Sequence, residues 1–376
     1  MHFLSCAGEL NHHGVFMCNS MYDILGDDYR RITTDTVNKE RLNLGYKKNI
    51  DAKYNIEQIN ADRKTVKSTI SWSDVVDFGA APEIYLEEAV KQNKIVFIRI
   101  ERLLKEGNWK LLIPHILIRY YRKYIRYKNN PNVYFLCVSA YAAKDLAKIG
   151  IKGKRVLQWA YCPEFKIADE NDFVKKEEKI NILWCGRMID WKHPEMALKI
   201  ATLLKNNGCN FNMKMIGDGE KKEELKRIIK EQNLDSYVEI LGSVDADRVR
   251  NFMRESDVFL ATSDKNEGWG VVINEAMNSA CVVFATPQMG ATPVLLKNNI
   301  NGFYLFPGNE ADAAKKIIEL NENENQMKKI KIAAYETIKN HFTPDIYAKR
   351  FVEIANDVID GNQNEYTNLG SIAKII

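Results

Sequence analysis

The strongest chemical signal in the chain is a short segment, residues 266–277, that reads NEGWGVVINEAM. It follows an apolar run typical of a buried strand and leads into a pattern typical of a helix. Gly268 and Gly270 let the backbone come close to a ligand. The amides of Gly270, Val271 and Val272 point out of the helix start, and this arrangement predicts a binding site for an anion.

Two carboxylates flank this predicted anion site. Glu267 lies directly before it, and Glu275 lies about one and a half turns into the helix. One carboxylate can face a reacting group while the other hydrogen-bonds elsewhere on the same ligand. On spacing alone, a strand–turn–helix junction with two solvated acids explains the segment nearly as well.

A second segment, residues 185–198, reads CGRMIDWKHPEMAL and supplies positive charge at the carboxyl end of another predicted strand. Arg187 and Lys192 lie on this loop. Two cations and a helix amino terminus at one edge of a sheet suit a diphosphate, whose charge as a leaving group they stabilise. The simpler alternative pairs Arg187 with Asp190 or Glu195 and leaves Lys192 in solvent. It explains either cation alone, but it does not explain both together with the glutamates.

The elements that must position these segments alternate along the second half of the chain. Short apolar runs predict buried strands, with stretches of helical length between them. This order predicts a parallel sheet that carries helices on both faces and binds its ligand at the carboxyl ends of its strands. The predicted strands are 182–185, 211–216, 238–241, 258–261 and 281–285, and the predicted helices are 194–204, 220–232, 246–255 and 270–279.

The first half repeats this pattern less clearly, and 376 residues are enough for two domains. We predict an N-terminal domain over 1–165, a linker over 166–180, a C-terminal domain over 181–343, and a segment 344–376 whose amphipathic helix packs back on the first domain. The predicted strands of the first domain are 2–5, 74–77, 95–98 and 133–138, and its predicted helices are 14–25, 82–92, 109–128 and 140–149.

Composition is that of an ordinary globular protein, with 45% hydrophobic and 28% charged residues. A net charge of +4, from 54 basic and 50 acidic residues, gives no reason to expect nucleic acid as a partner. We expect no secretory leader and no membrane-spanning segment. Seven scattered cysteines without a C-x-x-C pair predict neither disulfides nor structural zinc, and they fit a reducing cytoplasm.

Together the two segments resemble the donor domain of family-four retaining glycosyltransferases. The shared pattern is G-R-x4-K from Gly186, followed by E-G-[FW]-G-x4-E-A-[ML] from Glu267. The stretches 216–220, 240–243 and 256–263 fall in the family's usual order. The resemblance implies the GT-B architecture, an α/β fold in which two Rossmann-like parallel-sheet domains face each other across a cleft.

The resemblance also implies a role for each site residue. Arg187 and Lys192 hold the donor diphosphate, Glu267 lies beside the donor sugar, and Glu275 binds the ribose hydroxyls. Retention implies front-face attack, in which a donor phosphate oxygen takes the acceptor proton and Glu267 forms no covalent intermediate. We expect no metal and no cofactor. The residues implied in backbone contacts to the donor are Gly268, Trp269, Gly270, Val271 and Val272.

The implied function is transfer of a hexose from a UDP- or GDP-linked donor to a hydroxyl of a glycan or lipid-linked acceptor, in the cytoplasm. Two alternatives remain. A nucleotide-sugar 2-epimerase with the same fold would form product without an acceptor. A non-catalytic glycan-binding or scaffolding subunit would bind donor without turning it over.

The first domain resembles bacterial glycosyltransferases of surface-polysaccharide clusters, through residues 99–107, 137–145 and 158–164. It departs from the wider family in two places. Asp77 precedes Phe-Gly where many members carry a histidine, and residues 8–14, GELNHHG, replace a usual glycine pair.

Five residues of this domain are candidates for the site. Gly14 can open a helix toward the donor phosphates, and His12 or His13 can face the cleft. Glu101 and Arg102 are candidates to touch the acceptor, with a structural ion pair as the alternative.

Two short motifs are decoys. Asp245-Ala-Asp247 spells a metal-binding D-x-D, but it directly precedes a predicted helix, where aspartates cap free amides. Gly217-Asp-Gly219 follows a strand but lacks the third glycine of a dinucleotide turn, so we expect no NAD site.

Residues 109–128 carry six basic residues, no acids, Trp109 and four tyrosines. Basic and aromatic residues with an apolar face suit a helix lying on an anionic membrane, here the inner membrane. A core helix with a solvated basic edge explains the composition equally well, and both interpretations stay open.

Overall fold

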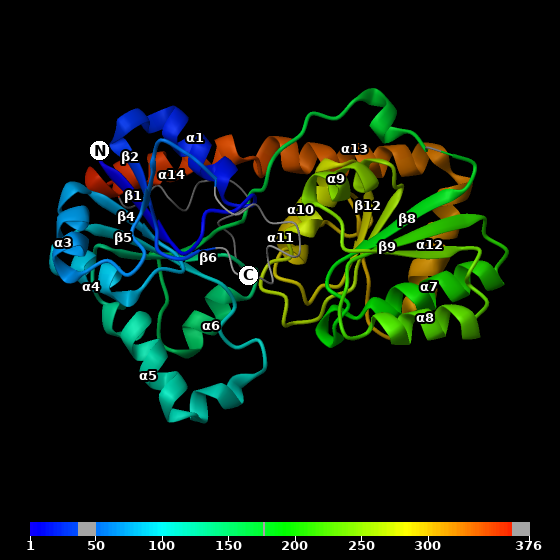
Figure 1. Ribbon diagram of the computed structural model, residues 1–376, viewed down its shortest axis with the longest axis horizontal. Coiled ribbons are helices and arrows are strands. Elements are labelled where there is room, and N and C mark those ends of the chain that lie inside the picture. Colours follow the sequence, from blue (N-terminus) through cyan, green and yellow to red (C-terminus); the bar gives the residue numbers. More distant parts are fainter. Residues whose placement is uncertain (37–49, 176, 363–376) are drawn as a thin grey trace. The chain divides into compact units, whose positions relative to one another are not determined.

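The computed structural model describes residues 1–36, 50–175 and 177–362. The chain divides into two compact units, and it passes from one to the other between Pro163 and Glu164 and again between Thr343 and Pro344 (Figure 1). The last helix therefore belongs to the first unit. No helix in the described ranges is both long and apolar enough to cross a membrane.

Unit 1 is built on a seven-stranded parallel sheet in the order β3-β2-β1-β4-β5-β6-β7. Its middle strands are almost fully buried, as expected where helices cover both faces. The strands are β1 Phe3–Ala7, β2 Tyr29–Thr33, β3 Asn55–Glu57, β4 Val75–Phe78, β5 Ile95–Ile100, β6 Val133–Cys137 and β7 Val156–Gln158. The helices are α1 Val15–Leu25, η1 Gly26–Asp28, α3 Arg63–Trp72, α4 Glu83–Lys91, η2 Asn108–Leu112, α5 Pro114–Lys123, η3 Ile125–Tyr127, α6 Ala142–Lys148 and α14 Pro344–Ile359.

The last helix, α14, packs beside α1 on one face of this sheet (Figure 1). Phe351 of α14 contacts Phe3 and Phe97, with ring centroids 4.9 and 5.1 Å apart. Leu4 and Cys6 alternate with Phe3 along β1 and join the core on the side of α3 and α4.

Unit 2 is built on a six-stranded parallel sheet in the order β10-β9-β8-β11-β12-β13. A fully buried ion pair, Lys331 Nζ to Asp257 Oδ1 at 2.7 Å, lies at the start of β11. The strands are β8 Ile180–Cys185, β9 Phe211–Ile216, β10 Val238–Gly242, β11 Val258–Ala261, β12 Val282–Ala285 and β13 Phe303–Tyr304. The helices are η4 Glu170–Phe173, η5 Asp190–Lys192, α7 Pro194–Asn206, α8 Lys222–Glu231, α9 Ala246–Arg254, α10 Val272–Asn278, α11 Thr292–Leu295, α12 Glu310–Glu322 and α13 Glu324–His341.

The prediction of an α/β protein with two parallel sheets is confirmed, but some local predictions were wrong. The single helix predicted over 109–128 is three separate pieces, because Pro114 has no amide hydrogen and restricts Ile113 to an extended conformation. Asp245 holds the N-cap position of α9, yet its side chain makes no capping hydrogen bond.

The segment predicted as a linker, 166–180, packs on unit 2 over its first part. Lys166 exchanges backbone hydrogen bonds with the Asn278 side chain, both at 2.8 Å, and the Ala168 amide donates to the Tyr335 hydroxyl at 3.1 Å.

Candidate functional site

The two predicted donor segments follow neighbouring strands. β8 and β11 pair in parallel, so the loops after their carboxyl ends lie side by side. The Asp264 amide donates to the Trp191 carbonyl at 2.9 Å, and the Thr262 hydroxyl donates to the Lys192 carbonyl at 2.6 Å. The Trp184 indole donates to the same hydroxyl at 2.8 Å. The two loops are therefore joined through their backbones.

Lys192 and Glu267 form an ion pair across these loops. The Lys192 ammonium hydrogen-bonds to Glu267 Oε2, and the two side chains are only 16% and 15% exposed. Ser263 Oγ donates to the same carboxylate oxygen at 3.4 Å, and Lys192 Nζ lies 4.6 Å from the centre of the Trp191 ring. Lys192 therefore does not simply face solvent.

The turn between Glu267 and α10 requires glycine. Gly270 has φ of +95°, and a Cβ on it would lie 2.5 Å from Met289 Cε and 3.3 Å from Glu267 Cγ. Trp269 is buried and its indole donates to Asn274 Oδ1 at 2.8 Å, so its side chain holds the turn and only its backbone can contact a donor.

Helix α10 begins at Val272, close to the predicted anion site. Val271 is its N-cap residue and makes no side-chain cap. The first amides of an α-helix have no intrahelical acceptor, so those of Val271 and Val272 suit an anion. Gly268, before them, is buried.

The charge of Glu275 reaches Cys185 at the end of β8. Burial raises the pKa of Cys185, the last residue of β8, to about 12, the Glu275 carboxylate adds to this rise, and Lys192 opposes it. Buried Arg250 of α9 donates to the Glu275 carbonyl at 2.8 Å and to Asn278 Oδ1, which anchors α10.

Arg187 is exposed on the loop after β8, and its guanidinium carbon lies 5.7 Å from the Trp191 ring centre. Its two suggested partners, Asp190 and Glu195, form ion pairs with Lys221 at 3.0 and 3.6 Å. The Asp190 hydrogen bond raises the pKa of Lys221, and Glu195 adds to this rise.

The Gly217-Asp-Gly219 motif has a packing role. Both glycines have positive φ, and a Cβ on them would lie 1.9 Å from the Gly186 carbonyl oxygen and 2.4 Å from that of Met188. The loop after β9 can therefore press against the loop that carries Arg187, which explains this motif without a dinucleotide.

His193, which follows Lys192 directly, was not among the predicted site residues. It has a left-handed backbone, φ 47° and ψ 51°, which is uncommon for a residue other than glycine. Its Nδ1 lies 2.9 Å from Glu195 Oε1 and its Nε2 lies 3.6 Å from Asp264 Oδ2, so the ring also joins the two loops. The available signal was a histidine between the motif lysine and the proline that opens α7.

In unit 1, the predicted phosphate-binding position at Gly14 is already engaged. Asn11 Oδ1 accepts from the amides of His13 and Gly14 at 3.1 and 3.2 Å, and the Asn11 carbonyl accepts from Gly14 and Val15 at 3.0 Å. A phosphate there would have to displace Asn11. The rings of His12 and His13 lie 3.9 Å apart, and burial lowers the pKa of His13 to about 4.

Glu101 and Arg102 also have protein partners. Glu101 pairs with Lys105 at 3.6 Å and accepts from the Tyr161 hydroxyl at 3.1 Å. Arg102 lies 3.8 Å from the buried Asp145 carboxylate. These contacts match the structural alternative considered for both residues.

Asp77, which stands near the family's histidine position, forms a bidentate pair with Arg99. The two hydrogen bonds measure 2.7 and 2.6 Å, and Ser5 Oγ donates to Asp77 at 3.1 Å. Burial opposes the charge of Arg99, but the Asp77 carboxylate outweighs it and raises the pKa of Arg99. Strand order brings these residues together, and the sequence does not show it.

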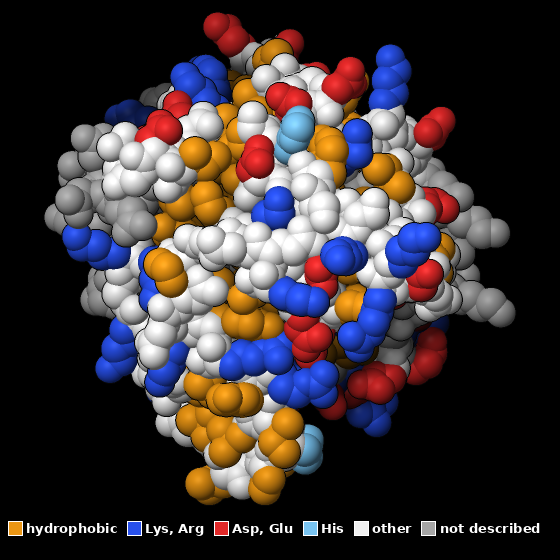
Figure 2. All heavy atoms as spheres, turned by 90° about the vertical axis from the view of Figure 1, so that its left-hand side faces the viewer, with side chains coloured by type: hydrophobic (Ala, Val, Ile, Leu, Met, Phe, Trp, Pro, Cys, Tyr) orange, Lys and Arg blue, Asp and Glu red, His pale blue; other side chains and the backbone are white. Residues whose placement is uncertain are grey.

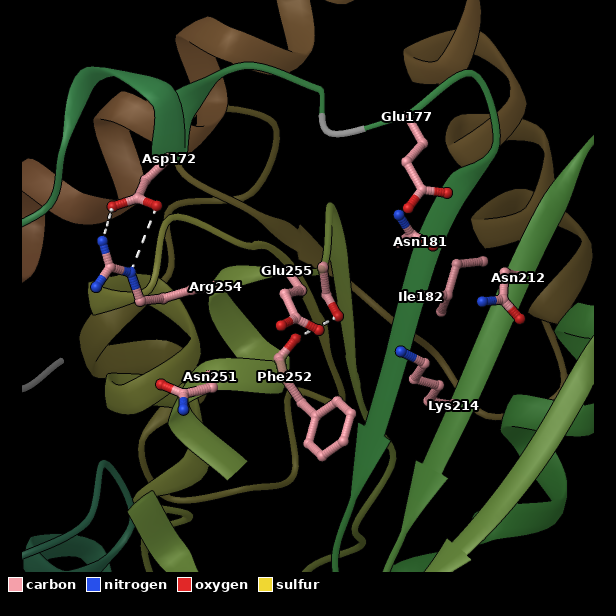
Figure 3. A pocket seen from close by; sticks show the side chains of 11 residues that line it. Asp172, Glu177, Asn181, Ile182, Asn212, Lys214, Asn251, Phe252, Arg254 and Glu255 are labelled. Carbon is pink, nitrogen blue, oxygen red and sulfur yellow. Dashed lines mark hydrogen bonds and ion pairs between the residues drawn. The ribbon is translucent and has the colours of Figure 1, made fainter. Parts of the chain in front are cut away.

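A pocket of about 450 Å³ in unit 2 lies elsewhere (Figure 3). Residues of the amino-terminal halves of β8 and β9 line it, and the Asp172–Arg254 ion pair, at 2.7 Å, flanks it. The donor segments follow the carboxyl ends of the strands, so this pocket is not the predicted donor site. Within residues 1–36, 50–175 and 177–362, no group of three or more histidine, cysteine or acidic side chains is placed to hold a metal ion.

Comparison with known families supplies the decisive observation. Residues 165–337 match the family model described as glycosyl transferases group 1. This segment is a group 1 glycosyltransferase domain. The matched segment contains both loops of the candidate site, so family membership and geometry concern the same residues.

Curated relatives of this group 1 glycosyltransferase domain include bacterial polysaccharide enzymes. The chain is 27% identical over 235 residues to the uncharacterized glycosyltransferase MJ1178 of Methanocaldococcus jannaschii, with 58% of this chain and 62% of that protein covered. It is 25% identical over 182 residues to the amylovoran biosynthesis glycosyltransferase AmsK of Erwinia amylovora, with 47% and 44% covered. The chain therefore spans less than two thirds of either relative.

Among solved structures, the chain resembles Anabaena HepE in complex with UDP and glucose. The TM-score is 0.69 at 15% identity, over 94% of this chain and 99% of that one. A likeness at this identity shows the fold. The fold is GT-B, with two Rossmann-like parallel-sheet domains, as predicted, and the group 1 glycosyltransferase domain is its second half.

Proposed function

We propose that this protein is a retaining glycosyltransferase that moves a hexose from a UDP- or GDP-linked donor to a hydroxyl of a glycan or lipid-linked acceptor. The observation that carries the proposal is the Lys192–Glu267 pair, which joins the two motif loops inside a group 1 domain. The relative AmsK is named as a glycosyltransferase of amylovoran biosynthesis, and this similarity supports a role for the present protein in surface polysaccharide formation.

In the proposed reaction the acceptor oxygen attacks the anomeric carbon on the face from which the diphosphate departs. The bond from that carbon to the diphosphate oxygen breaks, and its electron pair leaves with the diphosphate. The acceptor proton passes to a donor phosphate oxygen. Arg187, Lys192 and the amides at the start of α10 stabilise the departing charge.

The ion pair gives donor binding a specific consequence. In the structure, the Lys192 ammonium is held by the Glu267 carboxylate. A diphosphate competes for the ammonium, and Glu267 is then free to accept hydrogen bonds from the donor sugar. Glu275, anchored through Arg250 and Asn278, binds the ribose hydroxyls.

UDP is the better-supported nucleotide, because HepE was solved with UDP and glucose and shares the fold. The test is calorimetry and thermal shift with UDP, GDP, ADP and CMP and their common sugar conjugates, with and without EDTA. Selective stabilisation by one nucleoside diphosphate in EDTA supports the proposal and its metal independence. Turnover that EDTA abolishes would contradict metal independence.

Two variants separate the proposed roles. Glu275→Ala should weaken donor binding, whereas Lys192→Ala should mainly slow transfer, by about 10²–10³-fold if it stabilises the leaving group. Lys221→Ala is the matched control, since the Lys221 side chain is 17% exposed, close to the 16% of Lys192, and also pairs with carboxylates. Unchanged kinetics in both test variants would contradict the site.

The same measurements address the other two functions. Donor binding without turnover by any acceptor indicates a glycan-binding subunit, and product formed without acceptor indicates an epimerase. A lipid-linked acceptor would place the protein at the cytoplasmic face of a membrane.

A further inference from the structure

Unit 1 exposes a cluster of large apolar side chains on η2 and α5. Trp109, Leu112, Ile118 and Tyr121 are 52%, 83%, 58% and 56% exposed. Figure 2 shows hydrophobic side chains gathered at the lower end of this face, with lysine and arginine side chains just above them. Figure 1 shows α5 at that end of the unit. A contiguous cluster of exposed apolar side chains is typical of a surface that binds a protein or a membrane.

The local structure explains why these side chains point outward. Pro114 separates η2 from α5, and Tyr120 is the one residue of α5 that is buried. Its hydroxyl donates to the Leu103 carbonyl at 2.9 Å and holds the helix to the unit. Most of the other residues of α5 are exposed, so α5 is not a core helix, the alternative that composition left open.

Positive charge surrounds the apolar cluster. Arg122 and Arg126 pair with Glu83 and Glu87 of α4, at 3.2 and 2.8 Å, and Lys110 pairs with Glu106 at 2.8 Å. These three acids neutralise three of the six cations within 109–128. The others are Arg119, Lys123 and Lys128, and no ion pair joins them to the described residues.

We propose that η2 and α5 dock on an anionic lipid bilayer. Exposed aliphatic side chains enter the boundary between headgroups and acyl chains, and the flanking cations stay among the anionic headgroups. Trp109 suits the interface, because its ring is apolar while its indole N–H is already bonded to the Glu106 carbonyl at 2.9 Å. This inference does not depend on the transfer activity.

The first experiment is flotation of the full chain with vesicles at physiological salt. Wild type should float with phosphatidylcholine vesicles that contain phosphatidylglycerol, and much less with phosphatidylcholine alone. L112E/I118E should lose at least tenfold in partitioning. I167E/I300E is the matched control, since Ile167 and Ile300 are 83% and 61% exposed in unit 2, and it should float as wild type does.

The second experiment tests charge. R119E/K123E should weaken binding to anionic vesicles by about thirtyfold or more, since each basic residue near such a surface contributes about a factor of five. K328E/K329E changes two exposed lysines of unit 2 and should have little effect. High salt should weaken wild-type binding and leave the double charge variant nearly unaffected.

A third measurement locates the contact. Trp109 fluorescence should shift to the blue on vesicle binding and be quenched by brominated lipid, and Trp109→Phe should remove this response. The buried indoles of Trp159, Trp184 and Trp269 are only 2–3% exposed and should not respond.

The proposal is overturned if wild type does not float with anionic vesicles, or if L112E/I118E floats as well as the control I167E/I300E. If wild type does not float but forms a dimer, and L112E/I118E is monomeric, the cluster is an interface with a second copy of the chain instead. Nucleotide binding measured on the same variants should stay unchanged. Failure of docking is thereby distinguished from failure of the proposed function.

Discussion

The carboxyl ends of the two sheets carry polar residues that are used differently. In unit 2, Lys192 and Glu267 come from loops after neighbouring strands and pair directly with each other. In unit 1, the corresponding candidates are engaged elsewhere: Gly14 donates to Asn11, and Arg102 faces Asp145.

This difference separates two kinds of polar residue that look alike in sequence. The unit 2 groups meet at the edge where a parallel sheet binds ligands, and they sit within the matched family segment. The unit 1 groups tie loops and helices to their own domain. The exposed feature of unit 1 is instead the apolar and basic surface of η2 and α5.

Both units contain charge pairs of low exposure, and the largest effect should come from breaking the fully buried Lys331–Asp257 pair of unit 2. Lys331→Met leaves Asp257 buried without its partner, and we expect a loss of about 3–5 kcal/mol in the free energy of unfolding. Arg99→Met should cost less, roughly 1–3 kcal/mol, because Arg99 is 25% exposed and Asp77 keeps the Ser5 hydroxyl. Urea unfolding measures both.

The order of these two losses is the informative result. If Arg99→Met were the more damaging change, the Arg99–Asp77 pair of unit 1 would be the stronger structural element and the comparison would be reversed. The double variant D257N/K331M should recover part of the stability, since it removes the uncompensated charge.

The second prediction uses two glycines, one in each unit, with nearly the same φ angle. Gly270 has φ of +95° beside Glu267, while Gly153 has φ of +98° and no atom within 4 Å of an added Cβ. Gly270→Ala should displace Glu267 and lower kcat/KM by about 10²-fold. Gly153→Ala should cost only about 1 kcal/mol of stability and leave the kinetics unchanged.

Equal kinetics for both alanine variants would mean that the turn before α10 does not position reacting groups. Circular dichroism and urea midpoints on both proteins separate this outcome from simple loss of folding.

Much of the fold could be predicted from the sequence, because the central strands are continuous apolar runs and the helix 344–359 is strongly amphipathic. The strands β2, β3, β7 and β13 were missed, since they are short or of mixed polarity. The residues of the donor loops could be named from their motifs. Their pairing could not, because β8 and β11 are neighbours in the sheet but not in the chain.

Other contacts escaped prediction for the same reason. His193 bridges Glu195 and Asp264, and its role depends on a left-handed backbone that no sequence pattern specifies. The Asp77–Arg99 pair depends on the register of β4 and β5. Pro114 was visible in the sequence, and its effect on the predicted helix 109–128 was underestimated.

The last prediction concerns His13, a candidate site residue of unit 1. Burial lowers its pKa from 6.5 to about 4. The unfolded chain therefore takes up a proton below pH 6.5 that the folded chain takes up only near pH 4, so stability falls as pH falls through this window. We expect His13 to contribute about 3 kcal/mol of the loss between pH 7 and pH 4.

His13→Gln should remove this contribution, so the urea midpoint of the variant should change less between pH 7 and pH 4 than that of wild type. His12→Gln is the control, since it alters the neighbouring ring but not the buried one. A structural role predicts that the donor and acceptor KM values of His13→Gln stay within about twofold of wild type at pH 7. A large rise in the acceptor KM with no change in the pH profile would instead place His13 in the acceptor site, and the contrast between the two units would no longer hold.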